Sequence, residues 1–160
     1  MESVNLYALT AWLTTITAFC VGILVYAKNP RGTVNRRWFV MSLNITFWSL
    51  FLGLMFNSKD AISSLRYSKI LMIGANLIPI TFYHFVLAFL DFEKEKQQRR
   101  FSVLAYLLTS FILSVSLTAF FIRGVSYKTL VRCFYPDAGS LFIVHIFVYF
   151  LLTGYSCILM

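Results

Sequence analysis

The chain has 160 residues, of which 59% are hydrophobic and 12% charged, and its formal net charge is +8. A soluble domain has about 45–50% apolar and about 25% charged residues, so this composition excludes an ordinary soluble protein and indicates an integral membrane protein. The basic charge predicts contact between basic connectors and anionic lipid head groups of the bilayer, and no nucleic-acid partner.

Five hydrophobic segments are long enough to cross a bilayer as helices. They cover residues 6–27, 38–56, 70–90, 101–122 and 141–160. We therefore expect an all-α fold, a polytopic transmembrane helix bundle with five spans that forms a single domain over residues 1–160. The last segment is still hydrophobic at Met160, with no polar or basic flank after it, so we expect the chain to be truncated at its C-terminus.

The connectors between these segments differ in composition. Pro30 and Gly32 follow the first segment and end its helix. Residues 91–100, DFEKEKQQRR, are the most charged stretch, and we interpret them as a solvated turn. Residues 123–140 are interpreted as a loop with a turn at its Pro-Asp-Ala-Gly sequence, and Cys133 lies alone in that loop.

The lysines and arginines of the connectors predict the orientation of the bundle. The first and third connectors hold eight of them within 20 residues, whereas the second and fourth hold six within 31. Basic residues concentrate in cytoplasmic loops of membrane proteins. We therefore expect the first and third connectors inside the cell and the N-terminus outside.

The segment 70–90 carries the most informative polar residues. Asn76, Tyr83 and His84 recur at helical spacing, so they share one face of the helix. Pro79 lies between them, where it removes one backbone hydrogen bond and favours a kink. Such a polar stripe needs to be covered by protein rather than lipid.

The second segment adds Asn44 and Trp48 to the candidates. Asn44 and His84 are expected at the same depth in the membrane, which predicts a contact between them. We favour an interhelical hydrogen bond over a ligand or proton site for this pair. His145, near the outer end of the last segment, is interpreted as an ordinary interfacial histidine. The candidate ligand-binding or signalling residues are Asn44, Trp48, Asn76, Pro79, Tyr83 and His84.

Catalysis and metal binding find no support in the sequence. It has no catalytic-triad motif, P-loop or dinucleotide fingerprint, and its two histidines are far apart without an acidic partner in the spans. We predict no catalytic site, no metal site and no cofactor. The spans hold no Asp, Glu, Lys or Arg, which disfavours an ion carrier and favours a receptor for an unknown small or apolar ligand.

Three stretches occur in a characteristic order: YAKNPRGTVNRRWFVMSLNITFWSLFLGL, SKILMIGANLIPITFYHFVLAFLDFEK and YPDAGSLFIVHIFVYFLLTGY. Together they resemble the N-terminal seven-transmembrane region of bacterial sensor histidine kinases. The matching features are the basic connector 29–37, Trp48, Pro79 with the acidic patch 91–93, and the opening of the last segment at 139–142. The resemblance covers nearly all 160 residues and corresponds to five of seven helices.

The resemblance implies the signal-input domain of a histidine kinase or related signal-transduction protein in a two-component system. It implies a multi-pass protein of the bacterial inner membrane, a cytoplasmic output region outside this chain, and a homodimer as the usual form of such sensors. The alternatives are a small stand-alone transport or partner-binding subunit, and an enzyme that acts on lipid. No catalytic residue is carried over, although the full-length protein would be a kinase.

Overall fold

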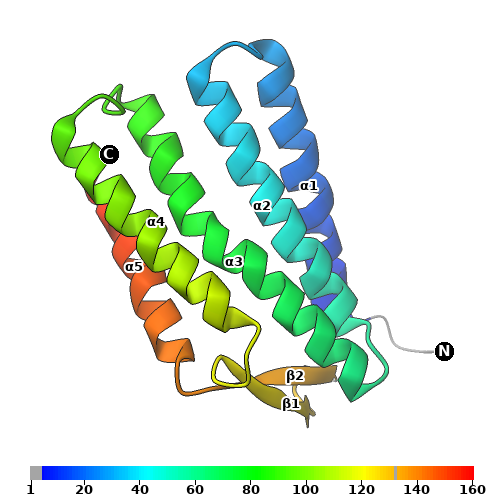
Figure 1. Cartoon of the computed structure of the whole chain (residues 1–160). Coiled ribbons are helices and arrows are strands. Elements are labelled where there is room, and N and C mark those ends of the chain that lie inside the picture. Colours follow the sequence, from blue (N-terminus) through cyan, green and yellow to red (C-terminus); the bar gives the residue numbers. More distant parts are fainter. Residues whose placement is uncertain (1–4, 132) are drawn as a thin grey trace.

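The computed structural model describes residues 5–131 and 133–160 and is mostly helical (Figure 1). Its elements are α1 (Leu6–Lys28), α2 (Thr33–Phe56), α3 (Ala61–Phe89), α4 (Lys96–Ser116), β1 (Ile122–Lys128), β2 (Cys133–Ala138) and α5 (Phe142–Leu159). Within the described residues four helices, α1, α2, α3 and α5, are long and apolar enough to cross a membrane.

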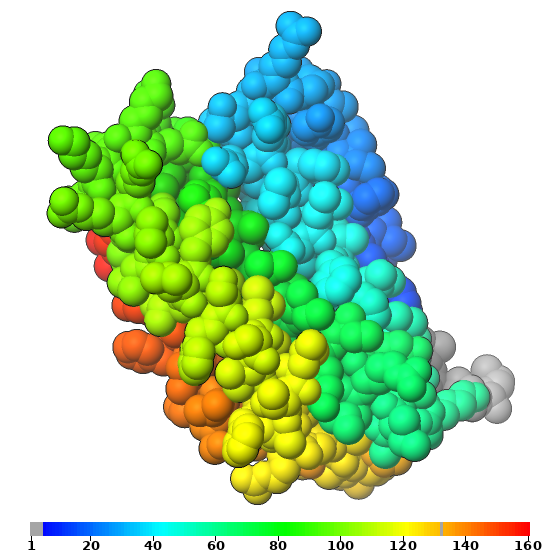
Figure 2. Space-filling view, in the orientation of Figure 1, coloured from blue at the N-terminus to red at the C-terminus, as the bar shows by residue number. Residues whose placement is uncertain are grey.

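The helix α3 lies at the centre of the bundle. It contacts α2 on one side, α4 and α5 on the other, and both strands at one end (Figure 1). The space-filling view shows α4 covering α5, of which only an edge is visible on this face (Figure 2). The α1–α2 and α3–α4 turns lie at one end of the bundle, and the strands and the α2–α3 turn lie at the other (Figure 1).

Polar residues extend α3 well beyond the predicted hydrophobic segment, which begins at residue 70. The carboxylate of Asp60 caps the helix by accepting a 2.8 Å hydrogen bond from the Ser63 N–H, and the hydrogen bonds from Ser63 lower the pKa of Asp60. The hydroxyl of buried Ser64 donates to the carbonyl of Phe134 at 2.6 Å. Hydropathy marks the apolar part of a helix, whereas its start is determined by the cap.

Close approach of α2 and α3 depends on a glycine. A Cβ atom at Gly74 would lie 3.0 Å from the ring of Phe47 and 3.1 Å from the backbone nitrogen of Trp48. Small residues allow membrane helices to approach closely, and the gain comes from van der Waals contact. Gly74 therefore holds the central helix against its neighbour along the segment that leads to Asn76.

The predicted helix over residues 101–122 is wrong at both ends, because α4 covers Lys96–Ser116. Its first turn includes part of the charged stretch that we interpreted as a solvated turn. Its last predicted turn is irregular up to Phe121 and then enters β1 at Ile122, and these two residues are buried in the core at 1% and 2% exposure. Phe121 and Ile122 are apolar because they pack against protein. Hydropathy does not distinguish residues that are buried in protein from residues that contact lipid.

The predicted loop 123–140 is also wrong, because β1 and β2 form an antiparallel hairpin there. Asp137 accepts a 2.8 Å hydrogen bond from the Ser126 hydroxyl and lies 3.2 Å from the Lys128 ammonium, and both contacts lower the pKa of Asp137. Cys133 is buried in β2 and does not lie in a loop. In a two-stranded sheet every strand is an edge, so Pro136 is tolerated in β2. The fold is mostly helical rather than all-α.

Candidate functional site

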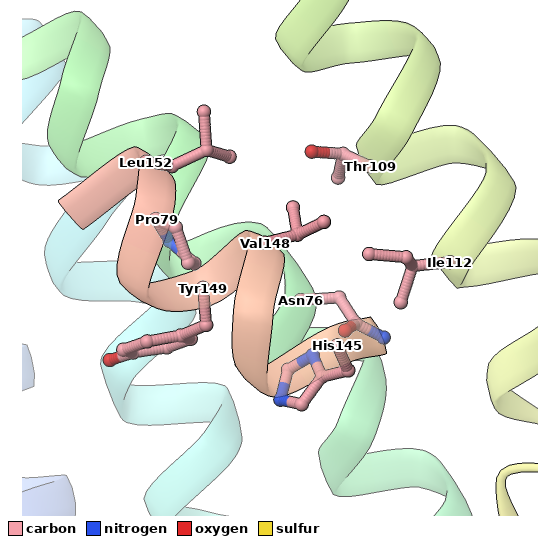
Figure 3. A pocket seen from close by; sticks show the side chains of 8 residues that line it. All are labelled: Asn76, Pro79, Thr109, Ile112, His145, Val148, Tyr149 and Leu152. Atoms are coloured by element: carbon pink, nitrogen blue, oxygen red, sulfur yellow. The ribbon is translucent and has the colours of Figure 1, made fainter. Parts of the chain in front are cut away.

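Three polar side chains from three helices line one small cavity beside the middle of α3 (Figure 3). Asn76 comes from α3, Thr109 from α4 and His145 from α5, and they are 5%, 4% and 8% exposed. Together with apolar neighbours they line a cavity of about 10 Å³. A volume of that size holds about one water molecule. We call these three residues the polar cluster.

The polar cluster is short of hydrogen-bond partners. Neither the amide nitrogen nor the amide oxygen of Asn76 has a partner, and the Thr109 hydroxyl has none. The ring of His145 packs on Phe121, Phe142 and Tyr149, and within the described part of the chain it makes no hydrogen bond. Buried polar groups are nearly always paired in folded proteins, so this cluster is available to a polar group from outside the chain.

Pro79 adds a further acceptor next to the polar cluster. It lies inside α3 and lines the same cavity. Because proline has no N–H, the carbonyl four residues earlier, that of Ala75, loses its helical donor. The middle of α3 therefore combines an unpaired side-chain amide with a backbone carbonyl that its own helix does not satisfy.

A groove of about 280 Å³ lies next to the polar cluster, between α2, α3 and α5. It is lined by Trp48, Met72, Ala75, Ile78, His145, Ile146, Tyr149 and Phe150. His145 and Tyr149 line the small cavity as well, so the two spaces are adjacent. Among the residues that the structure describes, no charged side chain lines either space. We call this space the apolar groove.

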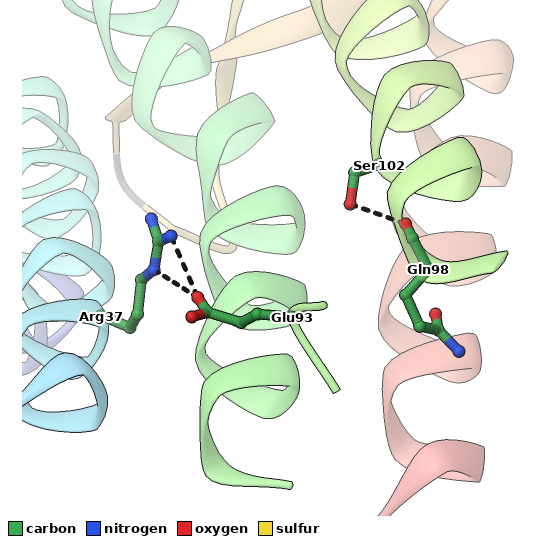
Figure 4. Close-up of polar contacts among 4 residues, drawn as sticks. All are labelled: Arg37, Glu93, Gln98 and Ser102. Atoms are coloured by element: carbon green, nitrogen blue, oxygen red, sulfur yellow. Dashed lines mark hydrogen bonds and ion pairs between the residues drawn. The ribbon is translucent and has the colours of Figure 1, made fainter. Parts of the chain in front are cut away.

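Tyr83 belongs to a second polar group nearer the α3–α4 turn. Its hydroxyl is fully buried and donates to the side-chain oxygen of Gln98 at 3.0 Å. The hydroxyl of Tyr155 donates to the same oxygen at 3.2 Å, and Ser102 donates to the Gln98 carbonyl at 2.8 Å (Figure 4). Unlike Asn76, Tyr83 is satisfied within the chain and ties α3 to α4.

An ion pair joins two neighbouring segments at the same end. The guanidinium of Arg37, on α2, lies 3.0 Å from the carboxylate of Glu93 in the α3–α4 turn (Figure 4). Asp91 allows this turn to reverse direction by adopting a φ of 58°. The two side chains are 42% and 32% exposed, so the pair contributes at most about 1 kcal/mol.

The predicted contact between Asn44 and His84 is wrong. The Asn44 amide donates to the carbonyl of Val40 on its own helix at 3.1 Å. The ring of His84 lies 5.2 Å from that of Tyr106, and its Nε2 atom has no partner. The two residues were paired on depth in the membrane, and depth does not determine in which direction around the helix a side chain points.

The six candidate residues are therefore separated in space. Asn76 and Pro79 line the small cavity and Trp48 lines the apolar groove. Tyr83, His84 and Asn44 lie elsewhere. The sequence analysis missed Thr109 and interpreted His145 as interfacial, whereas both are buried. A signal for His145 was present, because His145, Val148, Leu152 and Ser156 share one face of α5 at helical spacing, and this is its buried face.

Comparison with known proteins identifies the region. A family model described as the N-terminal 7TM region of histidine kinase matches residues 10–160. No curated protein and no solved structure matches the chain.

Proposed function

The chain belongs to the family of N-terminal 7TM regions of histidine kinases, and from this premise we propose that it receives a stimulus in the membrane and passes it to a cytoplasmic output region. Membership in the family and several long apolar helices indicate a multi-pass membrane sensor domain. We further propose that the protein lies in the bacterial inner membrane with its N-terminus outside. It forms a homodimer, and its basic inner connectors contact anionic lipids.

We count α4 as the fifth span in this proposal. Its outward face is apolar, because Val103, Leu107 and Phe111 are 57%, 65% and 56% exposed. These residues are four apart and lie on one side of the helix. An apolar face of that kind suits contact with lipid, and the polar residues of α4 lie mainly at its start or on its buried face.

The mechanism we propose is a change in how α3 packs against its neighbours. α3 contacts α2, α4, α5 and the hairpin, so a bend in α3 alters the whole bundle. Pro79 is buried in the middle of this helix, and helices bend most readily where proline removes a hydrogen bond. A stimulus that binds one bend better than the other shifts the population between two arrangements. The position of Pro79 beside the unpaired polar cluster is the observation that carries this proposal.

Replacing Pro79 tests the proposal in the full-length kinase. Alanine at position 79 restores the helical N–H and favours a straight helix, so Pro79→Ala is expected to change basal autophosphorylation in native membranes. A change of about fivefold corresponds to a shift of roughly 1 kcal/mol between the two arrangements. Pro30→Ala, in the α1–α2 turn, is the matched control and should keep basal output unchanged. If Pro79→Ala inserts normally and its basal output equals that of the wild type, the bend is not the signalling element.

A further inference from the structure

We propose that the polar cluster binds the uncharged head of an amphiphile whose apolar part lies in the apolar groove. The inference rests on the proposed sensor function and deepens it, because it names the chemical class of the stimulus and the place where it binds. It assigns the ligand to Asn76, Thr109 and His145 on one side and to groove residues such as Trp48 and Phe150 on the other.

The unpaired polar atoms that line the small cavity are the first observation that points to a ligand. Asn76 and Thr109 present one amide donor group, one amide acceptor and one hydroxyl to the cavity, all without partners. Within a bilayer no solvent reaches such groups, so leaving them unpaired is costly. A ligand hydroxyl accepts from the Asn76 amide nitrogen and donates to its amide oxygen or to His145. The cavity has room for one water-sized group, so the head is a hydroxyl or carbonyl rather than a large polar group.

The uncharged lining of both spaces restricts the charge of the ligand. Within residues 5–131 and 133–160, no Lys, Arg, Asp or Glu lines the small cavity or the apolar groove. A carboxylate, phosphate or ammonium head would therefore be buried without a counter-charge, which is strongly unfavourable. This excludes ordinary ionic lipids and fatty acids and leaves uncharged amphiphiles.

The volume and exposure of the apolar groove restrict the size of the ligand and its route of entry. Its volume of about 280 Å³ is at the lower limit of small-molecule pockets and fits one chain or one small ring system. Ile146 and Phe150 on its rim are 36% and 69% exposed, so the groove opens on the outer surface of the bundle. An uncharged amphiphile enters the groove through this opening.

Photolabelling of the chain in lipid nanodiscs tests the site directly. The probe is a ten-carbon alcohol with a diazirine in its chain, and the matched probes are the alkane and the carboxylate of the same length. We expect the alcohol to label groove residues such as Ile78 and Ile146 about five- to tenfold more than either matched probe, which is the factor that one or two hydrogen bonds produce. Labelled peptides are identified by mass spectrometry.

Variants that retain volume connect the labelling to the polar cluster. Asn76→Leu, Thr109→Val and His145→Phe should each lower labelling by the alcohol toward the level of the alkane. These substitutions remove unpaired polar groups from an apolar setting, so they should not reduce thermal stability. Asn44→Leu is the matched control, because the Asn44 amide is paired within its own helix. Ile146→Trp fills the groove from its exposed rim and should abolish labelling with the polar cluster intact.

Equal labelling by the alcohol and the alkane, or labelling unchanged in Asn76→Leu, overturns the proposal and assigns the cavity to a trapped water only. Labelling by the carboxylate at the level of the alcohol also overturns it. The binding assay needs no output region, so it fails or succeeds independently of signalling. If the alcohol binds at this site but does not change autophosphorylation of the full-length kinase, the result contradicts the proposed sensor function and supports the proposed binding site.

Discussion

Two polar residues on the same face of α3 have different environments. Tyr83 is fully buried, and its hydroxyl is paired with Gln98, a residue of the next helix. Asn76, two turns earlier, is also buried, but its side chain has no hydrogen-bond partner among the described residues. The spacing of the residues therefore does not reveal their roles, and the number of satisfied hydrogen bonds does. Tyr83 connects helices, and Asn76 is open to a ligand.

We predict that Tyr83→Phe lowers the free energy of unfolding by about 0.6 kcal/mol, and by less than about 2 kcal/mol, because hydrogen bonds between membrane helices have this magnitude. The variant leaves the side-chain oxygen of Gln98 with the Tyr155 hydroxyl as its remaining donor among the described residues. Thermal unfolding in detergent measures the change. Tyr106→Phe is the control, because Tyr106 is 49% exposed and should show no loss. Equal effects of the two variants would contradict a structural role for the Tyr83 hydroxyl.

At the scale of elements, the hairpin determines how α5 returns to the bundle. The N–H of Gly139 donates to the carbonyl of Phe121 at 2.8 Å, and the N–H of Leu141 donates to that of Phe120 at 2.9 Å. A Cβ atom at Gly139 would overlap the Phe120 carbonyl. Only glycine allows this close approach of the two segments, and the approach places His145 one turn into α5 against Phe121.

We predict that Gly139→Ala destabilises the protein by about 1–3 kcal/mol, the usual effect of overpacking. The backbone at Phe120 must shift to accept the methyl group, and α5 shifts with it. Gly154→Ala, in the middle of α5, is the matched control. No atom lies within 4 Å of a Cβ there, so alanine should be neutral or stabilising by about 0.5–1 kcal/mol. Both variants are compared by thermal unfolding, and equal midpoints would show that the junction tolerates a side chain.

At the scale of the whole molecule, the connectors separate into two groups. The connectors expected inside, at residues 29–32 and 90–95, lie at one end of the bundle, where Arg37 near the start of α2 pairs with Glu93 in the α3–α4 turn. The hairpin and the α2–α3 turn lie at the opposite end (Figure 1). This pair links α2 to the α3–α4 turn at that end of the bundle.

We predict that a membrane-impermeant maleimide labels Ser58→Cys in intact cells, because the α2–α3 turn is expected outside. Lys94→Cys should react only after the membrane is permeabilised, because the α3–α4 turn is expected in the cytoplasm. Both substitutions are made after Cys20, Cys133 and Cys157 are replaced, so that a single thiol is present. Labelling is measured by the mass shift of the purified protein. The reverse pattern would invert the proposed orientation.

The amino-acid sequence by itself determined the membrane class, the approximate positions of the long helices and the family resemblance, which the family comparison confirms. These properties depend on local composition, because a bilayer accepts only segments that are apolar and satisfy their own backbone hydrogen bonds. Helix starts such as Asp60 lay outside the hydropathy signal, since a cap is polar.

Only the tertiary structure decided which polar side chains meet. In the structure α4 ends at Ser116, and the stretch that contains Pro136 forms a strand of the hairpin. His145 is buried, as are Asn76 and Thr109. Those three residues are separated by more than 30 positions in the chain, so no local pattern connects them. Whether they line one cavity depends on how each helix is rotated, and that rotation follows from side-chain packing over the whole bundle.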